Sequence, residues 1–180
     1  MSVPGLQFRL AAPADAALLG EFMARNFLFA YGHCSTPENV QAAVSEHYGE
    51  PAQLRQIADP SRVNLLAIVG SEWVGHAQLR ASECVPTGVA GRPALELARF
   101  YVDQGRHGSG VAQAMMREVK ALARRDGGAS LYLSVWKDAP QAIRFYSKEG
   151  FAISGELIFM VGDDPKQDWL MTCPLGPAAS

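Results

Sequence analysis

The stretch from Leu95 to Met116 constrains the fold of this chain more than any other part of its sequence. Its first eight residues are mostly apolar, β-branched or aromatic, which favours an extended, half-buried strand. Turn-forming residues then break this pattern, and from Val111 the apolar residues recur at helical spacing. The sequence therefore predicts a strand, a turn and a helix over residues 108–126.

Two glycines, Gly108 and Gly110, lie where the turn joins the predicted helix. Glycine lets backbone approach a ligand closely, and the first helical N–H groups have no partner within the helix. Together with the helix dipole, these donors would bind an anion such as a pyrophosphate, although a tight turn without a ligand fits the glycines equally well. A dinucleotide fingerprint is excluded because Gln113 stands where it needs glycine or alanine, and Gly110 is not followed by the Lys and Ser/Thr of a P-loop.

Two motifs resemble those of the GCN5-related N-acetyltransferases (GNAT superfamily). In that family a strand leads into a Q/R-x-x-G-x-G/A loop that holds the pyrophosphate of acetyl-CoA, and His107 to Ala112, HGSGVA, resembles this loop with histidine in the Gln/Arg position. Residues 136–151, WKDAPQAIRFYSKEGF, are similar to the family's N-x-x-A-I-x-F-Y-x-K-x-G-F. Because Ala139 replaces the motif's asparagine, we predict that Asp138 caps the following helix instead.

The spacing of apolar and turn residues divides the chain into alternating elements. Strands are predicted at residues 6–11, 62–69, 73–80, 95–102, 131–136, 151–160 and 168–173. Helices are predicted at 13–29, 36–48, 51–58, 108–126 and 139–149, with Thr36 as an N-cap before Pro37. A helix between two buried strands implies a parallel pair with a right-handed crossover. The fold class is therefore α/β, and the resemblance implies a single-domain GNAT fold: a mixed, mostly antiparallel sheet of about six or seven strands with a parallel central pair, flanked by about four or five helices.

The amino-acid composition of the chain limits the classes of function that it can have. The chain has 180 residues, 48% of them hydrophobic, which is enough for one globular domain spanning residues 1–180. With 16 basic and 18 acidic residues the net charge is −2, so we expect no nucleic-acid partner. We expect no membrane partner and no signal peptide, because no apolar stretch has the required length or flanks. The three widely spaced cysteines indicate a cytoplasmic location and no metal site.

The resemblance assigns the chemistry of acetyl transfer to two side chains. Transfer from a thioester to an amine needs a neutral amine, a stabilised oxyanion and a protonated leaving thiolate. Tyr146 occupies the position of the general acid that protonates the CoA sulfur, whereas its spacing alone would also suit a core tyrosine. Glu96 matches a general base of some family members; alternatively it orients a cationic substrate, or faces Arg99 and solvent.

The resemblance also implies a binding site for acetyl-CoA as co-substrate. In the family, a bulge in the central strand frees backbone amides for the acetyl carbonyl and the pantetheine, here near residues 100–102. The expected CoA-binding residues lie on the central strand, the glycine loop and the last helix: Phe100, Tyr101, Val102, His107, Gly108, Ser109, Gly110, Val111, Ala112, Ala139 and Tyr146. His33, Cys34 and His47 fall in the region that often walls the acceptor site, where we expect structural roles.

The acceptor is a primary amine whose identity the sequence leaves open. The segments TPENV and VGDDPKQDWLM resemble a subgroup that includes PaiA-type polyamine acetyltransferases. Polyamines, amine-bearing antibiotics and protein amines are all consistent with that resemblance, and the family's terminal strands often pair in a homodimer. The alternative function is a non-catalytic module that binds acyl-CoA and acts as a sensor or regulator, which the substitutions Ala139 and His107 favour and the intact Tyr146 and Glu96 oppose.

Overall fold

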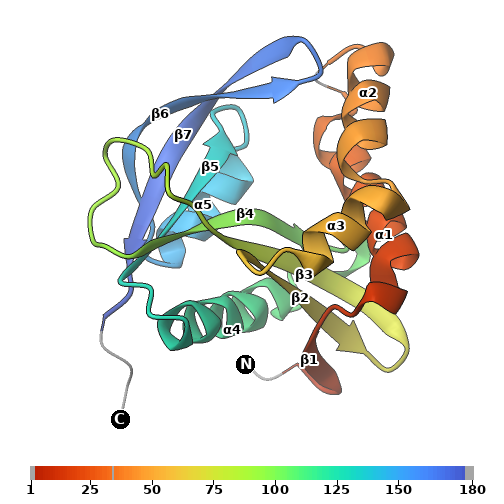
Figure 1. Cartoon of the computed structure of the whole chain (residues 1–180), viewed down its shortest axis with the longest axis horizontal. Helices are drawn as coiled ribbons and strands as arrows, with labels where there is room; N and C mark the ends of the chain where they lie inside the picture. The colour runs from red at the N-terminus through yellow and green to blue at the C-terminus, as the bar shows by residue number, and fades with distance from the viewer. Residues whose placement is uncertain (1–2, 34, 177–180) are drawn as a thin grey trace.

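The computed structural model describes residues 3–33 and 35–176, which form one seven-stranded sheet with helices on both faces (Figure 1). The strands are β1 (Leu6–Leu10), β2 (Arg62–Val69), β3 (Glu72–Ala81), β4 (Ala94–Val102), β5 (Ser130–Trp136), β6 (Ala152–Val161) and β7 (Asp164–Pro174). The helices are α1 (Ala16–Tyr31), α2 (Pro37–His47), α3 (Glu50–Ala58), α4 (Val111–Arg125) and α5 (Pro140–Lys148), with 3₁₀ turns η1 (Pro13–Asp15) and η2 (Gln104–Arg106). The strand order is β1-β2-β3-β4-β5-β7-β6, antiparallel except for the pair β4–β5. The predicted fold class is confirmed.

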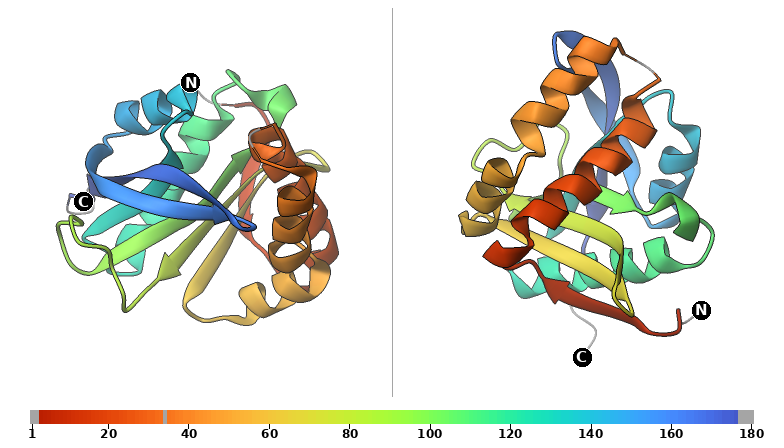
Figure 2. Two further views of the ribbon diagram at one scale, coloured as in Figure 1. Left: turned by 90° about the horizontal axis from the view of Figure 1, so that it is seen from above. Right: turned by 90° about the vertical axis from the view of Figure 1, so that its right-hand side faces the viewer.

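Each face of the sheet has its own hydrophobic core. Helices α4 and α5 pack on one face, where Val111, Met115, Val119 and Leu122 are buried as their spacing predicts. Helices α1 and α2 pack on the other face together with α3, and Figure 2 shows these three helices side by side. Within the described residues, none of the helices combines the length and apolarity needed to cross a membrane. The sheet therefore separates two helical layers.

The central strands β4 and β5 are paired over only part of their length. Their parallel register runs from Ala94 opposite Ser130 to Glu96 opposite Tyr132. After that point, in the described part of the chain, β4 is paired with β3, and β5 with β7. A register shift at Ala98 also bends β4, because Gln78 faces Arg99 while Leu79 faces Leu97. The two strands therefore diverge and leave one edge of β4 without a neighbouring strand.

Two local predictions at helix starts are wrong. Helix α4 begins at Val111 rather than at residue 108, because Gly108 and Gly110 have φ angles of 77° and 89°, outside the right-handed helical region. Asp138 does not cap α5; Ala139 holds the N-cap position and makes no side-chain capping bond. Pro140 explains this shift, since it occupies the first turn and disfavours helical backbone at the residue before it.

Close packing between α1 and the connection from α2 to α3 gives a stability prediction. A Cβ added to Gly20 would lie 2.3 Å from the backbone oxygen of Tyr48. We expect Gly20→Ala to lower the free energy of unfolding by roughly 1–3 kcal/mol, because backbone must move and the overpacking outweighs the better helix propensity of alanine. Denaturant unfolding measures the change. Gly49→Ala is the control, since its Cβ would meet Pro51 Cδ at 3.7 Å; equal losses for the two variants would contradict the packing argument.

Candidate active site

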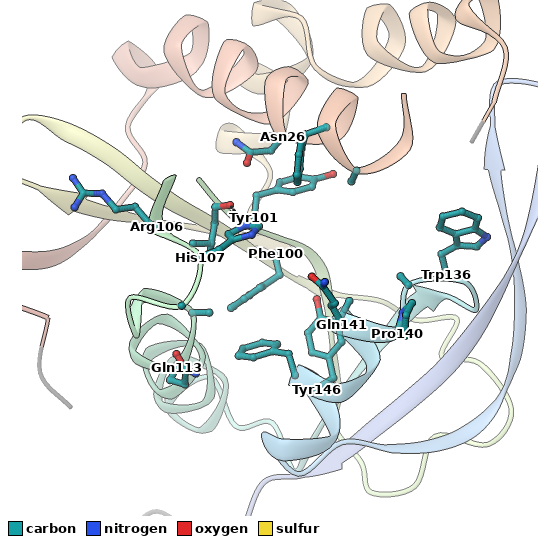
Figure 3. A pocket seen from close by; sticks show the side chains of 18 of the residues that line it. Asn26, Phe100, Tyr101, Arg106, His107, Gln113, Trp136, Pro140, Gln141 and Tyr146 are labelled. Carbon is teal, nitrogen blue, oxygen red and sulfur yellow. Dashed lines mark hydrogen bonds between the residues drawn. The ribbon is translucent and has the colours of Figure 1, made fainter. Parts of the chain in front are cut away.

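A cleft of about 700 Å³ opens where β4 and β5 diverge (Figure 3). Its walls come from α1, the end of β4, the glycine loop (residues 107–112), the connection from β5 to α5, and α5 itself. The predicted CoA-binding residues that line this cleft are Phe100, Tyr101, Val102, His107, Gly108, Gly110, Ala112, Ala139 and Tyr146. Segments predicted separately from the two motifs are thus brought together around one space.

Ser109 and Val111 are not among the residues that line the cleft. The Ser109 hydroxyl donates a hydrogen bond to the Arg106 carbonyl at 2.5 Å. The Val111 side chain is fully buried in the core beneath α4. Any contribution of these two residues to ligand binding would therefore come from their backbone.

The glycine loop before α4 has the backbone geometry of an anion site. The first bond of the helix runs from the Ala114 N–H to the Gly110 carbonyl, so the amides of residues 111–113 have no intrahelical partner. An added Cβ on Gly108 would meet no atom within 4 Å, so the space beside this residue is open. Free amides, the positive end of the helix dipole and open space fit a diphosphate group.

His107 links the glycine loop to the end of β4. Its Nε2–H donates a hydrogen bond to the Val102 carbonyl at 3.1 Å, and its ring meets the edge of Phe29 at 6.2 Å between centroids. A carbonyl only accepts, so this bond assigns the proton to Nε2. The histidine therefore fixes the position of the loop relative to the strand.

Hydrogen bonding along β4 directs particular amides toward the cleft. The Asp103 N–H donates to the Val74 carbonyl on β3 at 3.0 Å, and Val102 lies opposite Gly75. Because bonded and non-bonded pairs alternate in antiparallel strands, the N–H groups of Val102 and Phe100 point to the edge away from β3. The bulge lies at Ala98, earlier in the strand than predicted, yet the amides near residues 100–102 still face the cleft.

Tyr146 points into the cleft from α5, on the side opposite the glycine loop. Its ring makes edge-on contacts with Phe100, Phe145 and Phe151, at centroid distances of 6.2, 5.4 and 5.7 Å. Figure 3 shows Tyr146 and Phe100 facing the same space. Burial raises the pKa of the Tyr146 phenol well above its usual value, so the hydroxyl keeps its proton at neutral pH. The cleft thus contains a phenol that is able to donate a proton.

Glu96 lies outside the residues that line the cleft. Its carboxylate accepts a hydrogen bond from Arg80 Nε at 2.7 Å, and 20% of its side chain is exposed. Arg80 faces Glu96 across the β3–β4 register, so the strand pairing itself holds the ion pair. The structure therefore brings Tyr146 and the glycine loop together, but not Glu96 with them.

Several residues that line the cleft were not among the predicted site residues. They lie on α1, on η2 and the start of α4, and from the β5–α5 connection into α5: Asn26, Phe29, Ala30, Arg106, Gln113, Asp138, Pro140, Gln141, Ala142 and Phe145. Asn26 carried a signal, because it is a polar residue at a core position of an amphipathic helix, where it is 7% exposed. His33 lines the cleft, the His47 side chain is 46% exposed, and Cys34 lies outside the described residues.

Several known proteins are similar to this chain in sequence or in fold. The family model described as "Acetyltransferase (GNAT) family" matches residues 27–151. A protein of Mycobacterium bovis named as an uncharacterized N-acetyltransferase is 31% identical over 157 residues, covering 87% of this chain and 96% of its own. A spermine/spermidine N(1)-acetyltransferase of Bacillus subtilis is 34% identical over 64 residues, 35% of this chain and 42% of that enzyme. The crystal structure of a PaiA N-acetyltransferase from Thermoplasma acidophilum in complex with coenzyme A superposes with a TM-score of 0.75 at 18% identity, covering 97% of this chain and 99% of that one.

Proposed function

Because the chain belongs to the acetyltransferase (GNAT) family, we propose that it transfers the acetyl group of acetyl-CoA to the primary amine of a small acceptor. The observation that carries this proposal is the divergence of β4 from β5. It leaves the free amides of β4, the glycine loop and the Tyr146 phenol around one cleft. Those are the three groups that a thioester with a diphosphate tail requires.

Each group has a separate role in the proposed reaction. Acetyl-CoA supplies the acetyl group as an activated thioester. The amides at the start of α4 hold its diphosphate, and the N–H groups of Phe100 and Val102 stabilise the negative charge on the acetyl oxygen. A C–N bond forms and the C–S bond breaks, and Tyr146 gives its proton to the departing sulfur. The new amide nitrogen loses a proton to solvent, from which the phenolate recovers its own.

Polyamines are the first acceptors to test. The spermine/spermidine N(1)-acetyltransferase of Bacillus subtilis shares one segment with this chain, and the PaiA N-acetyltransferase shares its fold. Aromatic and apolar side chains form much of the cleft wall, including Phe29, Phe145 and Trp136, which suits the methylene chain of such an amine. The proposal therefore concerns a small amine, with polyamines as one class among several.

The test is release of free thiol from acetyl-CoA in the presence of a panel of amines. The panel contains spermidine, spermine, an aminoglycoside, single amino acids and a short peptide with a free N-terminus. We expect turnover that depends on one class of amine and saturates with both substrates. Tight binding of acetyl-CoA without turnover on any amine would instead support the non-catalytic sensor function.

A further inference from the structure

Asp168 is a buried carboxylate that the family motifs do not include. It lies on β7, its side chain is 2% exposed, and its Oδ1 atom has no hydrogen-bond partner among the described residues. Within the same part of the chain it belongs to no ion pair. Burying a carboxylate that lacks a cationic partner costs several kcal/mol in general, so an unpaired group such as this one calls for an explanation.

The surroundings of Asp168 connect it to the cleft. It is directly opposite Trp136 in the β5–β7 register, and paired residues present their side chains on the same face; Trp136 lines the cleft. Ser134 is exposed on that face, and its hydroxyl lowers the pKa of the Asp168 carboxyl group. The carboxylate is therefore covered, but it lies beside a solvent-exposed residue of β5 and opposite a residue of the cleft wall.

Tyr31 of α1 connects Asp168 with the wall of the cleft. The pKa of the Tyr31 phenol is raised first by burial, and then by the charge of Asp168 and by the phenol of Tyr146. Tyr31 also packs against Trp136 with 6.4 Å between ring centroids. The Tyr31 ring thus packs on the tryptophan that lies opposite Asp168 in the strand pairing.

We propose that Asp168 is the group that attracts the acceptor's ammonium and takes its proton before acetyl transfer. The inference rests on the proposed function and adds the missing base. The N–H bond of the ammonium breaks and an O–H bond forms on the carboxylate, which leaves a neutral amine free to attack the thioester. After product release the carboxyl group returns this proton to solvent. Glu96 is unsuited to the same step because its carboxylate is already paired with Arg80, whereas that of Asp168 is in no ion pair within the described residues.

The charge environment agrees with this role. Burial raises the pKa of Asp168 to about 6, against the lowering effect of the Ser134 hydroxyl, so the group is mostly ionised at pH 7 and still basic enough to accept a proton. The charged and titratable groups of the elements around it include Tyr31, Tyr132, Tyr146, Glu96, Arg99, Asp164 and Lys166. On the neighbouring strand β6, Glu156 is paired with Lys137 at 2.9 Å. The tyrosines have raised pKa values and stay neutral near pH 6, Arg99 stays charged there, and Lys166 is paired with Asp164 at 2.7 Å.

The experiment measures kcat and KM against pH with the best acceptor from the panel. We expect the wild-type kcat to fall as pH drops below about 6, because protonated Asp168 no longer accepts a proton. In Asp168→Asn this acidic limb is lost, kcat falls at least 100-fold, KM for the amine rises and KM for acetyl-CoA stays constant. Asp168→Glu should restore part of the rate. Asp164→Asn, on the same strand but paired with Lys166, is the matched control and should keep the wild-type profile.

A milder variant keeps the proposal testable if Asp168→Asn folds poorly. Ser134→Ala removes the hydroxyl that lowers the Asp168 pKa, at an exposed site where folding is not at risk. We expect its acidic limb to move to higher pH with kcat at the plateau unchanged. A limb that stays in place in Ser134→Ala, or that survives in folded Asp168→Asn, overturns the role of Asp168. The role of Asp168 is also overturned if the acidic limb is lost in Glu96→Gln and not in Asp168→Asn. Each of these three results leaves turnover intact and so is distinct from failure of the proposed function, which is no turnover with any amine.

Discussion

Replacing Tyr146 with phenylalanine is expected to lower kcat roughly 100-fold while leaving the Kd for acetyl-CoA unchanged. Burial raises the pKa of this phenol, which is protonated across the neutral range, and Tyr146 lines the cleft. Tyr101 is a second phenol of the cleft lining, but its hydroxyl is hydrogen-bonded to the Tyr48 hydroxyl at 3.1 Å. Phenylalanine keeps the edge-on contacts with Phe100, Phe145 and Phe151, so the aromatic packing should survive. Steady-state kinetics gives kcat, and equilibrium titration with acetyl-CoA gives Kd.

The matched control is Tyr132→Phe. Tyr132 is a buried tyrosine on β5, 4% exposed, and it is not among the residues lining the cleft. Its replacement should leave kcat within about twofold of wild type, since it removes a phenol that takes no part in the reaction. An equal loss in both variants would mean that packing, not proton donation, links Tyr146 to the rate. An unchanged rate in Tyr146→Phe would remove the general acid from the mechanism.

Local signals in the sequence were sufficient for most of the fold. The Thr36 hydroxyl accepts a hydrogen bond from the Asn39 N–H at 3.3 Å, as an N-cap before Pro37 predicts. Helical spacing after Val111 likewise identified the buried face of α4. Both features depend on residues that are only a few positions apart, so the sequence alone is enough to predict them. The Asp138 error belongs to the same class, because the effect of Pro140 on the residue before it was available from the sequence.

The sequence alone could not predict which side chains meet across the sheet. The pairing of Glu96 with Arg80 depends on the β3–β4 register and on the bulge at Ala98, which displaces the strand by one residue. The burial of Asp168 depends on how β7 returns beside β5. Such contacts join residues far apart in the chain. The motifs therefore predicted the binding loop and Tyr146, whereas the roles of the carboxylates required three-dimensional structure.

Replacing Gly108 with alanine is expected to raise the KM for acetyl-CoA at least tenfold, equivalent to about 1.4 kcal/mol of binding free energy. The added Cβ would occupy the open space beside the loop, where the diphosphate is proposed to bind. The substitution also strains the backbone, because φ at Gly108 is +77° and a left-handed conformation costs an L-residue about 1–2 kcal/mol. Stability and binding must therefore be measured separately, by denaturant unfolding and by kinetics.

Gly127, beyond the opposite end of α4, separates the two effects. Its φ is +78° and an added Cβ would also meet nothing within 4 Å, so Gly127→Ala should lose the same stability as Gly108→Ala. It lies outside the cleft lining, and we expect its KM for acetyl-CoA to stay at the wild-type value. If both variants lose affinity equally, strain in α4 explains the loss; if neither loses affinity, the diphosphate binds elsewhere. Loss in Gly108→Ala alone would tie acetyl-CoA to the free amides that begin the helix, because in that comparison the two substitutions differ in position and not in backbone cost.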